Sequence, residues 1–312
     1  MFFSADSHGS TYVWRKWLSV PEFHKADILI LAGDLTGKAL VPLVEGDGGS
    51  YTTHYYGRKW ELKDDKEVLE MEERLTFSGT YPIRCTKSEL QELQNDRGKV
   101  EKIITQEITK RITEWMDMLI DKVDTRKVTT IVMPGNDDDF DIDPIIKSYE
   151  SDGIIYPLGK VVQIHKFETA SMDYVNPTPW DTPREAKEKE LGKKIDEAVS
   201  KLDDPSRSIF NFHCPPSNTR LDLAPKLKNL RPVVVAGEVV LEHVGSKSVR
   251  KAIEEYRPIM GLHGHIHESY ASDKVRDVPV VNPGSEYGEG ILRGFIIELT
   301  DEGVDKYWKV EG

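Results

Sequence analysis

Residues 128–141 read VTTIVMPGNDDDFD, a short β-branched run followed by a turn with one asparagine and four aspartates. The apolar part has the length and composition of a buried strand. In α/β sheets, ligands lie in the crevice beyond the carboxyl ends of the strands. The stretch therefore predicts a buried strand whose carboxyl end carries either a solvated acidic turn or a ligand site.

Four other apolar runs end in the same way. They are FFSAD, DILILAGD, SIFNFH and IMGLHGHIH, and helical patterns separate several of them, which predicts α/β architecture. If their carboxyl ends meet at one edge, a carboxylate- and histidine-rich cluster forms around Asn136. The polar residues at these ends are Asp6 and His8, Asp34, His213, and His265 and His267.

This set of side chains is typical of a metal site. Carboxylate, amide oxygen and imidazole suit Mn, Fe, Co, Ni or Zn, and no thiolate is among them. Seven ligands exceed the needs of one tetrahedral ion, but they suit two ions roughly 3.5–4 Å apart. Asp34 is the sole carboxylate on its strand end, so it is predicted to bridge the two ions.

Five motifs occur in a fixed order between residues 6 and 267: D-x-H-G, G-D, G-N-x-D, a lone histidine after a strand, and G-H-x-H. Together they resemble the calcineurin-like metallophosphoesterase superfamily, and NPGS at 282–285 is similar to its small prokaryotic members. TPWDTPRE at 178–185 and VGSKSVRKAIEEYRP resemble the Icc-related predicted phosphoesterases. The resemblance implies a four-layer α/β/β/α sandwich of two mixed sheets. It also implies one metal on Asp6, His8 and His267, another on Asn136, His213 and His265, and Asp34 shared between them.

By this resemblance the chain is expected to be a metal-dependent phosphoesterase, with a phosphodiesterase of a small molecule or nucleotide favoured. Two divalent ions, Mn foremost, would activate a hydroxide for in-line attack. Asn136 would touch the phosphate, and His265 or a metal-bound water would help the leaving group depart. Three alternatives stay open: a phosphomonoesterase with the same metals, a DNA nuclease of the same superfamily, and a catalytically weak scaffold. All seven ligand positions hold competent residues, which argues against the scaffold.

The residue after the asparagine departs from the pattern of many superfamily members. They carry a histidine there, which contacts the phosphate and protonates the leaving group, whereas this chain has Asp137 followed by Asp138. An aspartate beside two cations stays ionised, so it donates no proton and repels phosphate. We therefore expect Asp137 to point away from the phosphate or to act through a metal-bound water. Asp139 and Asp141 are expected to be solvated.

Other local signals predict structural roles. Asp143 followed by proline is typical of a helix N-cap. Thr182-Pro183-Arg184-Glu185 fits a capping box that opens a helix, with Arg184 solvated and Trp180 packed in the preceding loop. His263 alternates off the G-H-x-H pair and is expected to be buried or to support a ligand.

Composition and charge limit the partners. The net charge of −12 over 312 residues argues against duplex nucleic acid, which needs clustered cations, and favours a small phosphorylated substrate. No apolar run is long enough for a membrane span, MFFSADSHG lacks the features of a signal peptide, and two cysteines fit a reducing cytoplasm. Residues 1–312 are expected to form one domain with an insertion at 45–98, followed by a helix from Lys99. That insertion would cover the site, form an oligomer contact, or serve neither purpose.

Overall fold

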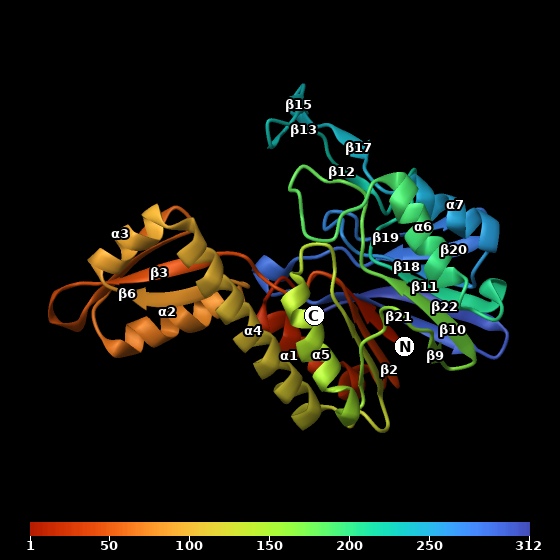
Figure 1. Ribbon diagram of the computed structural model, residues 1–312, viewed down its shortest axis with the longest axis horizontal. Coiled ribbons are helices and arrows are strands. Elements are labelled where there is room, and N and C mark those ends of the chain that lie inside the picture. Colours follow the sequence, from red (N-terminus) through yellow and green to blue (C-terminus); the bar gives the residue numbers. More distant parts are fainter.

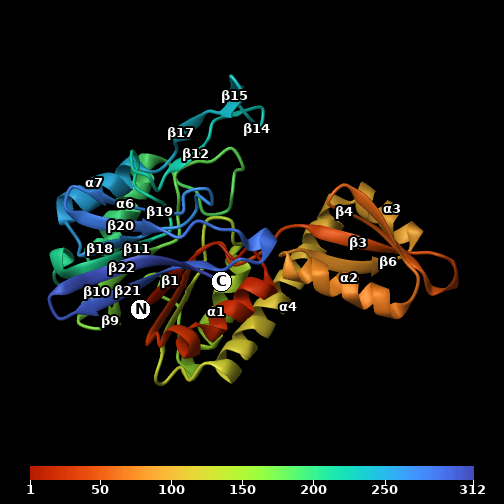
Figure 2. The ribbon, with the colours of Figure 1, turned by 180° about the vertical axis from the view of Figure 1, so that it is seen from behind.

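The computed structural model describes residues 1–312 and has the mixed α/β composition that the sequence predicts. Seven α-helices accompany two six-stranded sheets, one four-stranded sheet and three two-stranded ladders (Figures 1 and 2). None of the helices combines the length and apolarity that a membrane span requires. Five 3-10 turns complete the list: η1 (Asp47–Gly49), η2 (Phe140–Ile142), η3 (Glu150–Asp152), η4 (Pro205–Arg207) and η5 (Tyr287–Glu289).

The first six-stranded sheet contains the N-terminal strands in the order β22-β21-β1-β2-β7-β8. Neighbouring strands from β1 to β8 run parallel, whereas β21 and β22 are antiparallel. Ala32 pairs with Met133, so the loops after β2 and β7 leave the sheet side by side. The bounds are β1 (Phe2–Ser4), β2 (Ile28–Ala32), β7 (Thr129–Met133), β8 (Ile154–Ile155), β21 (Arg293–Thr300) and β22 (Gly303–Glu311).

The second six-stranded sheet has the order β19-β20-β18-β11-β10-β9. Its four central strands are parallel and its two edge strands antiparallel. Met172 pairs with Phe212, so the loops after β10 and β11 also emerge together. The bounds are β9 (Val162–Ile164), β10 (Phe167–Met172), β11 (Ser208–Phe212), β18 (Met260–Leu262), β19 (Ala271–Val275) and β20 (Val278–Asn282).

Three buried apolar clusters account for the packing of these sheets. One cluster joins side chains of both sheets, including Phe3 and Leu262. A second packs the first sheet against α1 (Thr11–His24), α4 (Arg97–Lys122) and α5 (Asp143–Ser148), and a third packs the second sheet against α6 (Glu188–Val199) and α7 (Lys247–Tyr256). Successive strand residues face opposite sides, so Phe2 joins the helix cluster while Phe3 joins the other sheet. Burial on both sides explains why these strands read as continuous apolar runs.

The insertion forms a separate lobe with its own sheet, of order β5-β4-β3-β6, and its own apolar cluster (left in Figure 1). Its predicted bounds of 45–98 were too short at the start, because β3 already pairs with β6 from Leu40 onward. The segment 74–86 has the aromatic and β-branched composition of strands, but its first residues complete a helix that covers the sheet. The elements are β3 (Leu40–Glu45), β4 (Tyr51–Tyr55), β5 (Arg58–Leu62), α2 (Asp65–Phe77), β6 (Tyr81–Cys85) and α3 (Lys87–Asn95).

The lobe contacts the loop that follows β1 through hydrogen bonds and close backbone packing. The Arg111 guanidinium of α4 donates to the carbonyl oxygens of Gly9 (2.9 Å) and Thr80 (3.1 Å). Gly79 has φ +86°, and a Cβ there would lie 2.1 Å from the His8 carbonyl oxygen. The close approach therefore requires glycine, and it holds the lobe beside the loop that carries His8.

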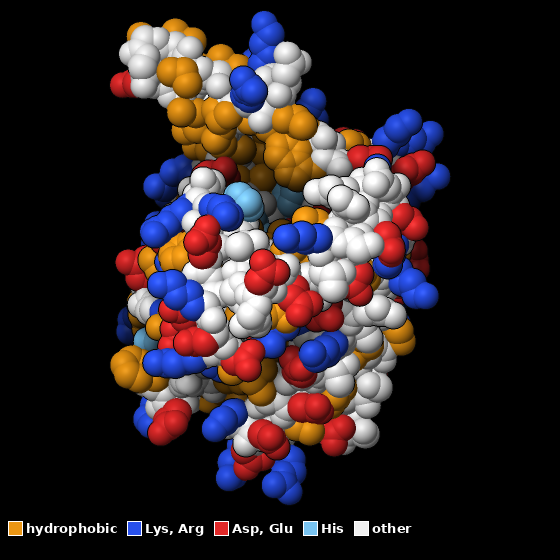
Figure 3. Space-filling model, turned by 90° about the vertical axis from the view of Figure 1, so that its left-hand side faces the viewer, with side chains coloured by type: hydrophobic (Ala, Val, Ile, Leu, Met, Phe, Trp, Pro, Cys, Tyr) orange, Lys and Arg blue, Asp and Glu red, His pale blue; other side chains and the backbone are white.

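A second projection is built from residues 223–243. Short ladders hold it together, and its exposed apolar side chains include Leu230, Val234 and Val235. Figure 3 shows apolar side chains on the projection at the top of the molecule, above a hollow in which histidine side chains are visible. The strands are β12 (Leu223–Pro225), β13 (Leu227–Lys228), β14 (Arg231–Pro232), β15 (Val234–Val235), β16 (Glu238–Val239) and β17 (Leu241–His243).

Two predicted helix starts were wrong. Helix α6 begins at Glu188, not after Thr182, because Glu185 accepts from the backbone and hydroxyl of Thr182 within a turn while Val175 and Glu185 form a β-bridge. Helix α5 includes Asp143, whose carboxylate pairs with a buried arginine instead of capping the helix.

Candidate metal centre

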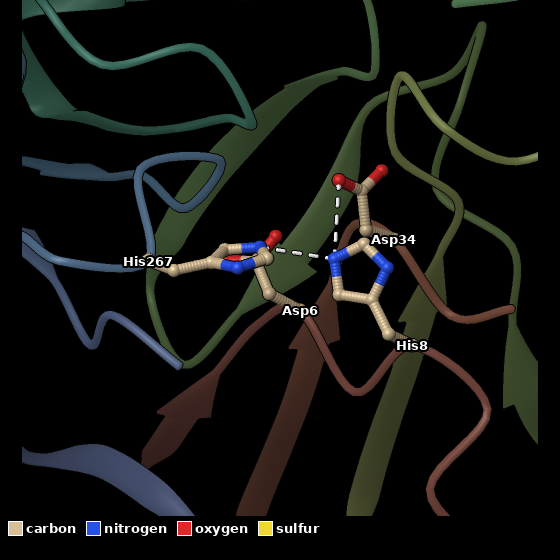
Figure 4. Close-up of side chains that lie close together, drawn as sticks. All are labelled: Asp6, His8, Asp34 and His267. Carbon is tan, nitrogen blue, oxygen red and sulfur yellow. Dashed lines mark hydrogen bonds and ion pairs between the residues drawn. The ribbon is translucent and has the colours of Figure 1, made fainter. Parts of the chain in front are cut away.

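The structure brings the seven predicted ligand residues together at the carboxyl ends of five strands. Asp34 belongs to two groups, and within each group one ligand atom per residue lies within 4.8 Å of the others. Asn136 joins the second group, with its Oδ1 3.1 Å from His213 Nε2. The first group comprises Asp6, His8, Asp34 and His267 (Figure 4), and the second comprises Asp34, His213 and His265.

In the first group, two ring nitrogens face each other. His8 Nε2 lies 2.9 Å from His267 Nε2 and 3.7 Å from Asp34 Oδ2 (Figure 4). Burial lowers the pKa of His267 to about 3 and also lowers the pKa of His8. Neutral imidazoles present a lone pair on one nitrogen, which is the form that binds metals.

In the second group, a backbone carbonyl oxygen orients the ring of His213. Its Nδ1 lies 3.2 Å from the Ala32 carbonyl oxygen, which places Nε2 3.4 Å from Asp34 Oδ2 and 3.7 Å from Asp6 Oδ1. Burial opposes charge on His213, but the two carboxylates outweigh it and raise the pKa of His213 to about 9. A cation that takes this nitrogen as ligand must displace a proton. Burial lowers the pKa of His265 to about 4.

The backbone at the ligand positions is strained. Asp6 (φ 59°), His8 (φ 41°), Asp34 (φ 44°) and His265 (φ 71°) all occupy the left-handed region. Such conformations cost on the order of 1–3 kcal/mol each and cluster at functional sites. Four of the fourteen non-glycine residues with positive φ thus belong to this one site.

The glycines of the G-D and G-N motifs allow the loops to approach closely. A Cβ on Gly33 would lie 1.9 Å from His213 Nδ1, and one on Gly135 would lie 2.4 Å from Asp34 Oδ1. Any side chain at either position would displace a ligand. The close packing of the site therefore requires the glycines of both motifs.

The residues fit divalent cations. Asp6 is fully buried, and its carboxylate accepts from the His265 backbone N–H (3.0 Å) without a lysine or arginine partner. A buried carboxylate is costly unless a countercharge balances it. Oxygen and imidazole donors around such carboxylates match the preferences of Mn, Fe, Co, Ni or Zn.

Asp137 lies at the rim of the site. Its backbone N–H donates to Asp34 Oδ1 (2.8 Å), and its carboxylate lies 3.2 Å from Lys38 Nζ and 3.9 Å from His8 Nδ1. Burial and then the Asp34 charge raise the pKa of Asp137 to about 7. Sequence reasoning missed Lys38, although it follows the G-D motif by four residues.

Asp138 has a structural role that sequence reasoning also missed. Its buried carboxylate accepts from the backbone N–H groups of Leu35 (2.9 Å), Thr36 (2.9 Å) and Gly135 (2.8 Å), and from the Thr36 hydroxyl (2.7 Å). It therefore joins the loops after β2 and β7. The aspartate of G-N-x-D thus serves to hold the loops together.

Arg184 and Trp180 have exchanged their predicted environments. Arg184 is 0% exposed, whereas Trp180 is 59% exposed. The Arg184 guanidinium lies 2.6 Å from Asp143 Oδ1 and 2.6 Å from Asp173 Oδ2, and it also donates to two backbone carbonyls of the acidic turn. Its planar fork satisfies several acceptors at once, which explains its burial.

The prediction that His263 is buried was correct. Its Nδ1 lies 2.8 Å from the Phe212 carbonyl oxygen and 2.9 Å from that of Cys214, so it joins the ends of β18 and β11. Asp141 is exposed as predicted, while Asp139 is half-buried.

Similarity to known proteins is partial at the level of sequence. No family model matches the chain. MJ1162, an uncharacterized protein of Methanocaldococcus jannaschii, is 35% identical over 127 residues, which are 40% of this chain and 51% of the relative. The match thus spans about half the length of that curated relative.

Solved structures extend the likeness to the whole chain. One crystal structure aligns with a TM-score of 0.57 at 17% identity, covering 99% of this chain and 97% of its own. TT1561 of Thermus thermophilus aligns with a TM-score of 0.52 at 13% identity, covering 94% of this chain and 92% of its own. At these identities the likeness shows a shared fold.

Proposed function

We propose that the chain is a dinuclear-metal-dependent phosphoesterase of the calcineurin-like metallophosphoesterase superfamily. The observation that carries the proposal is the meeting of seven ligand-competent side chains in two groups that share Asp34. Manganese is favoured among the divalent ions, with Fe, Zn, Co and Ni as alternatives. One ion would be held by Asp6, His8, Asp34 and His267, and the other by Asp34, Asn136, His213 and His265.

The proposed architecture is the four-layer α/β/β/α sandwich of that superfamily. Its support comes from the three apolar clusters: one between the two six-stranded sheets, and one between each sheet and its helices. The site lies where both sheets end their parallel strands, as expected for ligands of α/β folds.

The orientation of Asn136 follows from its neighbours. The Thr182 hydroxyl donates to Glu185 Oε1 (2.8 Å), so its oxygen accepts from Asn136 Nδ2 (2.9 Å). This leaves Asn136 Oδ1 facing His213 Nε2 at 3.1 Å. The amide oxygen, not the nitrogen, is therefore the group that Asn136 offers to an ion.

Two bound ions would screen phosphate charge and lower the pKa of a water at the site. The chain itself would position the phosphorus by the arrangement of its loops, which Asp138 and Arg184 hold in place. His265 belongs to the second group, and Asp137 lies at the rim of the first. A phosphodiester of a small molecule or nucleotide is the favoured substrate, and a monoester is the alternative.

The proposal is tested with purified chain, Mn²⁺ and a panel of phosphomonoesters, phosphodiesters and cyclic nucleotides. We expect two manganese ions per chain by elemental analysis, and hydrolysis that EDTA abolishes and Mn²⁺ restores. Hydrolysis of monoesters in preference to diesters would select the alternative substrate. One ion per chain at saturating Mn²⁺ would contradict the dinuclear site, and no hydrolysis of any ester would contradict the proposed activity.

Replacing Asp137 with histidine tests how the leaving group departs. Two bound cations would lower the raised pKa of Asp137 again and keep its carboxylate ionised, and an ionised carboxylate donates no proton. The enzyme should therefore cleave activated aryl diesters far faster than alkyl diesters. General acid catalysis contributes about 10²–10⁴-fold. Asp137→His should therefore reduce the ratio of kcat/KM for aryl diesters to kcat/KM for alkyl diesters by about this factor. The measurement is kcat/KM against leaving-group pKa, with Asp141→His on the same turn as the control. Equal slopes in wild type and variant would place residue 137 outside the reaction.

A further inference from the structure

Lys38 supplies the one ammonium or guanidinium group in the ion-pair network of the site. Its Nζ lies 3.2 Å from Asp137 Oδ1, and the other oxygen of that carboxylate lies 3.9 Å from His8 Nδ1. The remaining ion pairs of the ligand residues are between histidines and aspartates. Lys38 is thus the only lysine or arginine of this network.

The backbone that carries Lys38 is fixed. Asp138 accepts from Leu35 and Thr36 on one loop and from Gly135 on the other, so the two loops keep their spacing. A Cβ on Gly37 would lie 1.8 Å from the Gly79 carbonyl oxygen, so this position is closely packed as well. Because the backbone is fixed and the Lys38 side chain is flexible, its ammonium can move over a short range and still stay beside Asp137.

The Lys38 side chain is also accessible, being 37% exposed, while that of Asp137 is 24% exposed. An ammonium has three donors, and Asp137 occupies one of them, which leaves donors for another anion. Without Lys38, the Asp137 carboxylate would repel a phosphate arriving at the metals. With Lys38 present, the ammonium balances the charge of Asp137, and its free donors can bind an anion.

We propose that Lys38 binds the phosphate group of the substrate through its ammonium, and that Asp137 holds Lys38 at the site. This role rests on the proposed phosphoesterase function. The pair takes the place of the phosphate-contacting histidine that many superfamily members carry after the asparagine. Lys38 touches the substrate, whereas Asp137 acts through Lys38.

The test is the affinity of the manganese-loaded chain for inorganic phosphate, measured by isothermal titration calorimetry. Lys38→Met keeps an unbranched, flexible side chain of similar shape and removes the ammonium group. We expect it to weaken phosphate binding by about 10–100-fold, the range for a charge-assisted hydrogen bond. Lys38→Arg should recover part of the affinity. Lys66→Met, on an exposed lysine of α2, is the control and should bind as wild type does.

Two further readouts separate substrate binding from a structural role. Manganese content should stay at the wild-type value in Lys38→Met, and in ester hydrolysis KM should rise by more than kcat falls. If Asp137 holds Lys38 in place, Asp137→Asn should weaken phosphate binding in the wild type. In the Lys38→Met background the same change should strengthen binding, because it removes an unpaired carboxylate that repels phosphate. A loss of manganese in Lys38→Met would overturn the assignment.

Equal phosphate affinity of wild type and Lys38→Met, or a wild type that binds no phosphate, would also overturn it. Failure of the proposed function gives a different result. A wild type that binds phosphate through Lys38 but hydrolyses no ester would contradict the phosphoesterase and leave the anion site in place.

Discussion

Asp34→Asn is expected to remove divalent metal from both groups and to lower turnover by on the order of 10³-fold. Metal ions supply several kcal/mol of transition-state stabilisation, and each ~1.4 kcal/mol is a factor of ten in rate. Asp34 is the member common to both groups, with Oδ2 3.4 Å from His213 Nε2 and 3.7 Å from His8 Nε2. Its removal should therefore damage both sites at once.

Asparagine is the appropriate replacement because it changes charge with little change in shape. Residue 34 has φ 44°, a conformation that asparagine tolerates as aspartate does. The amide oxygen can still accept from the Asp137 N–H, which lies 2.8 Å from Asp34 Oδ1 in the wild type. What is lost is the charge and one oxygen acceptor. The backbone should therefore keep its fold.

Elemental analysis of metal per chain and kcat on the best ester of the panel decide the outcome. Asp47→Asn, on an exposed turn of the insertion, is the matched control and should retain both metals. Circular dichroism should show the same secondary structure for wild type and both variants. Loss of a single metal with appreciable turnover would show that another group bridges the ions.

Arg184→Met is expected to lower the free energy of unfolding by roughly 3–5 kcal/mol, the usual cost of breaking a buried ion pair from one side. Arg184 is fully buried and pairs with Asp143 and Asp173. Methionine fills part of the volume but leaves both carboxylates without their cation. It also removes the donors to the carbonyl oxygens of Asp138 and Asp139.

Urea unfolding, followed by circular dichroism, measures this effect as a lower midpoint at an unchanged slope. Arg184→Lys should fall between wild type and Arg184→Met, because one ammonium cannot reach the five acceptor atoms that the planar guanidinium satisfies. Arg126→Met, at a side chain that is 91% exposed, should change stability by less than about 0.5 kcal/mol. If Arg184→Met matches this control, the guanidinium contributes no net stability.

Much of the site could be predicted from the sequence because its signals are local. Buried parallel strands read as continuous apolar runs, and polar residues directly after them mark the binding edge. Asp6, Asp34, Asn136 and His213 each follow such a run, and the structure brings them together. Their role as metal ligands stays a prediction.

The acidic turn MPGNDDDFD contains residues that the sequence could separate and residues that it could not. The sequence singled out Asn136 among its polar residues, and the structure places that amide against His213. Asp138 looked the same as its neighbours, yet it alone is fully buried among the four aspartates and accepts from both loops. Identical side chains in a row differ only by which partners the fold brings to them.

The α/β class, the buried strands and the order of the motifs could be predicted from the sequence, since each depends on residues that lie close along the chain. The partners of Arg184, Asp138 and Lys38 could not, because they come from loops that are far apart in the sequence. Arg184 pairs with a residue 41 positions away, and Lys38 meets Asp137 from a different strand end. Local sequence patterns do not reveal such contacts, because the contacts depend on how loops distant in the sequence pack together and pair their charges.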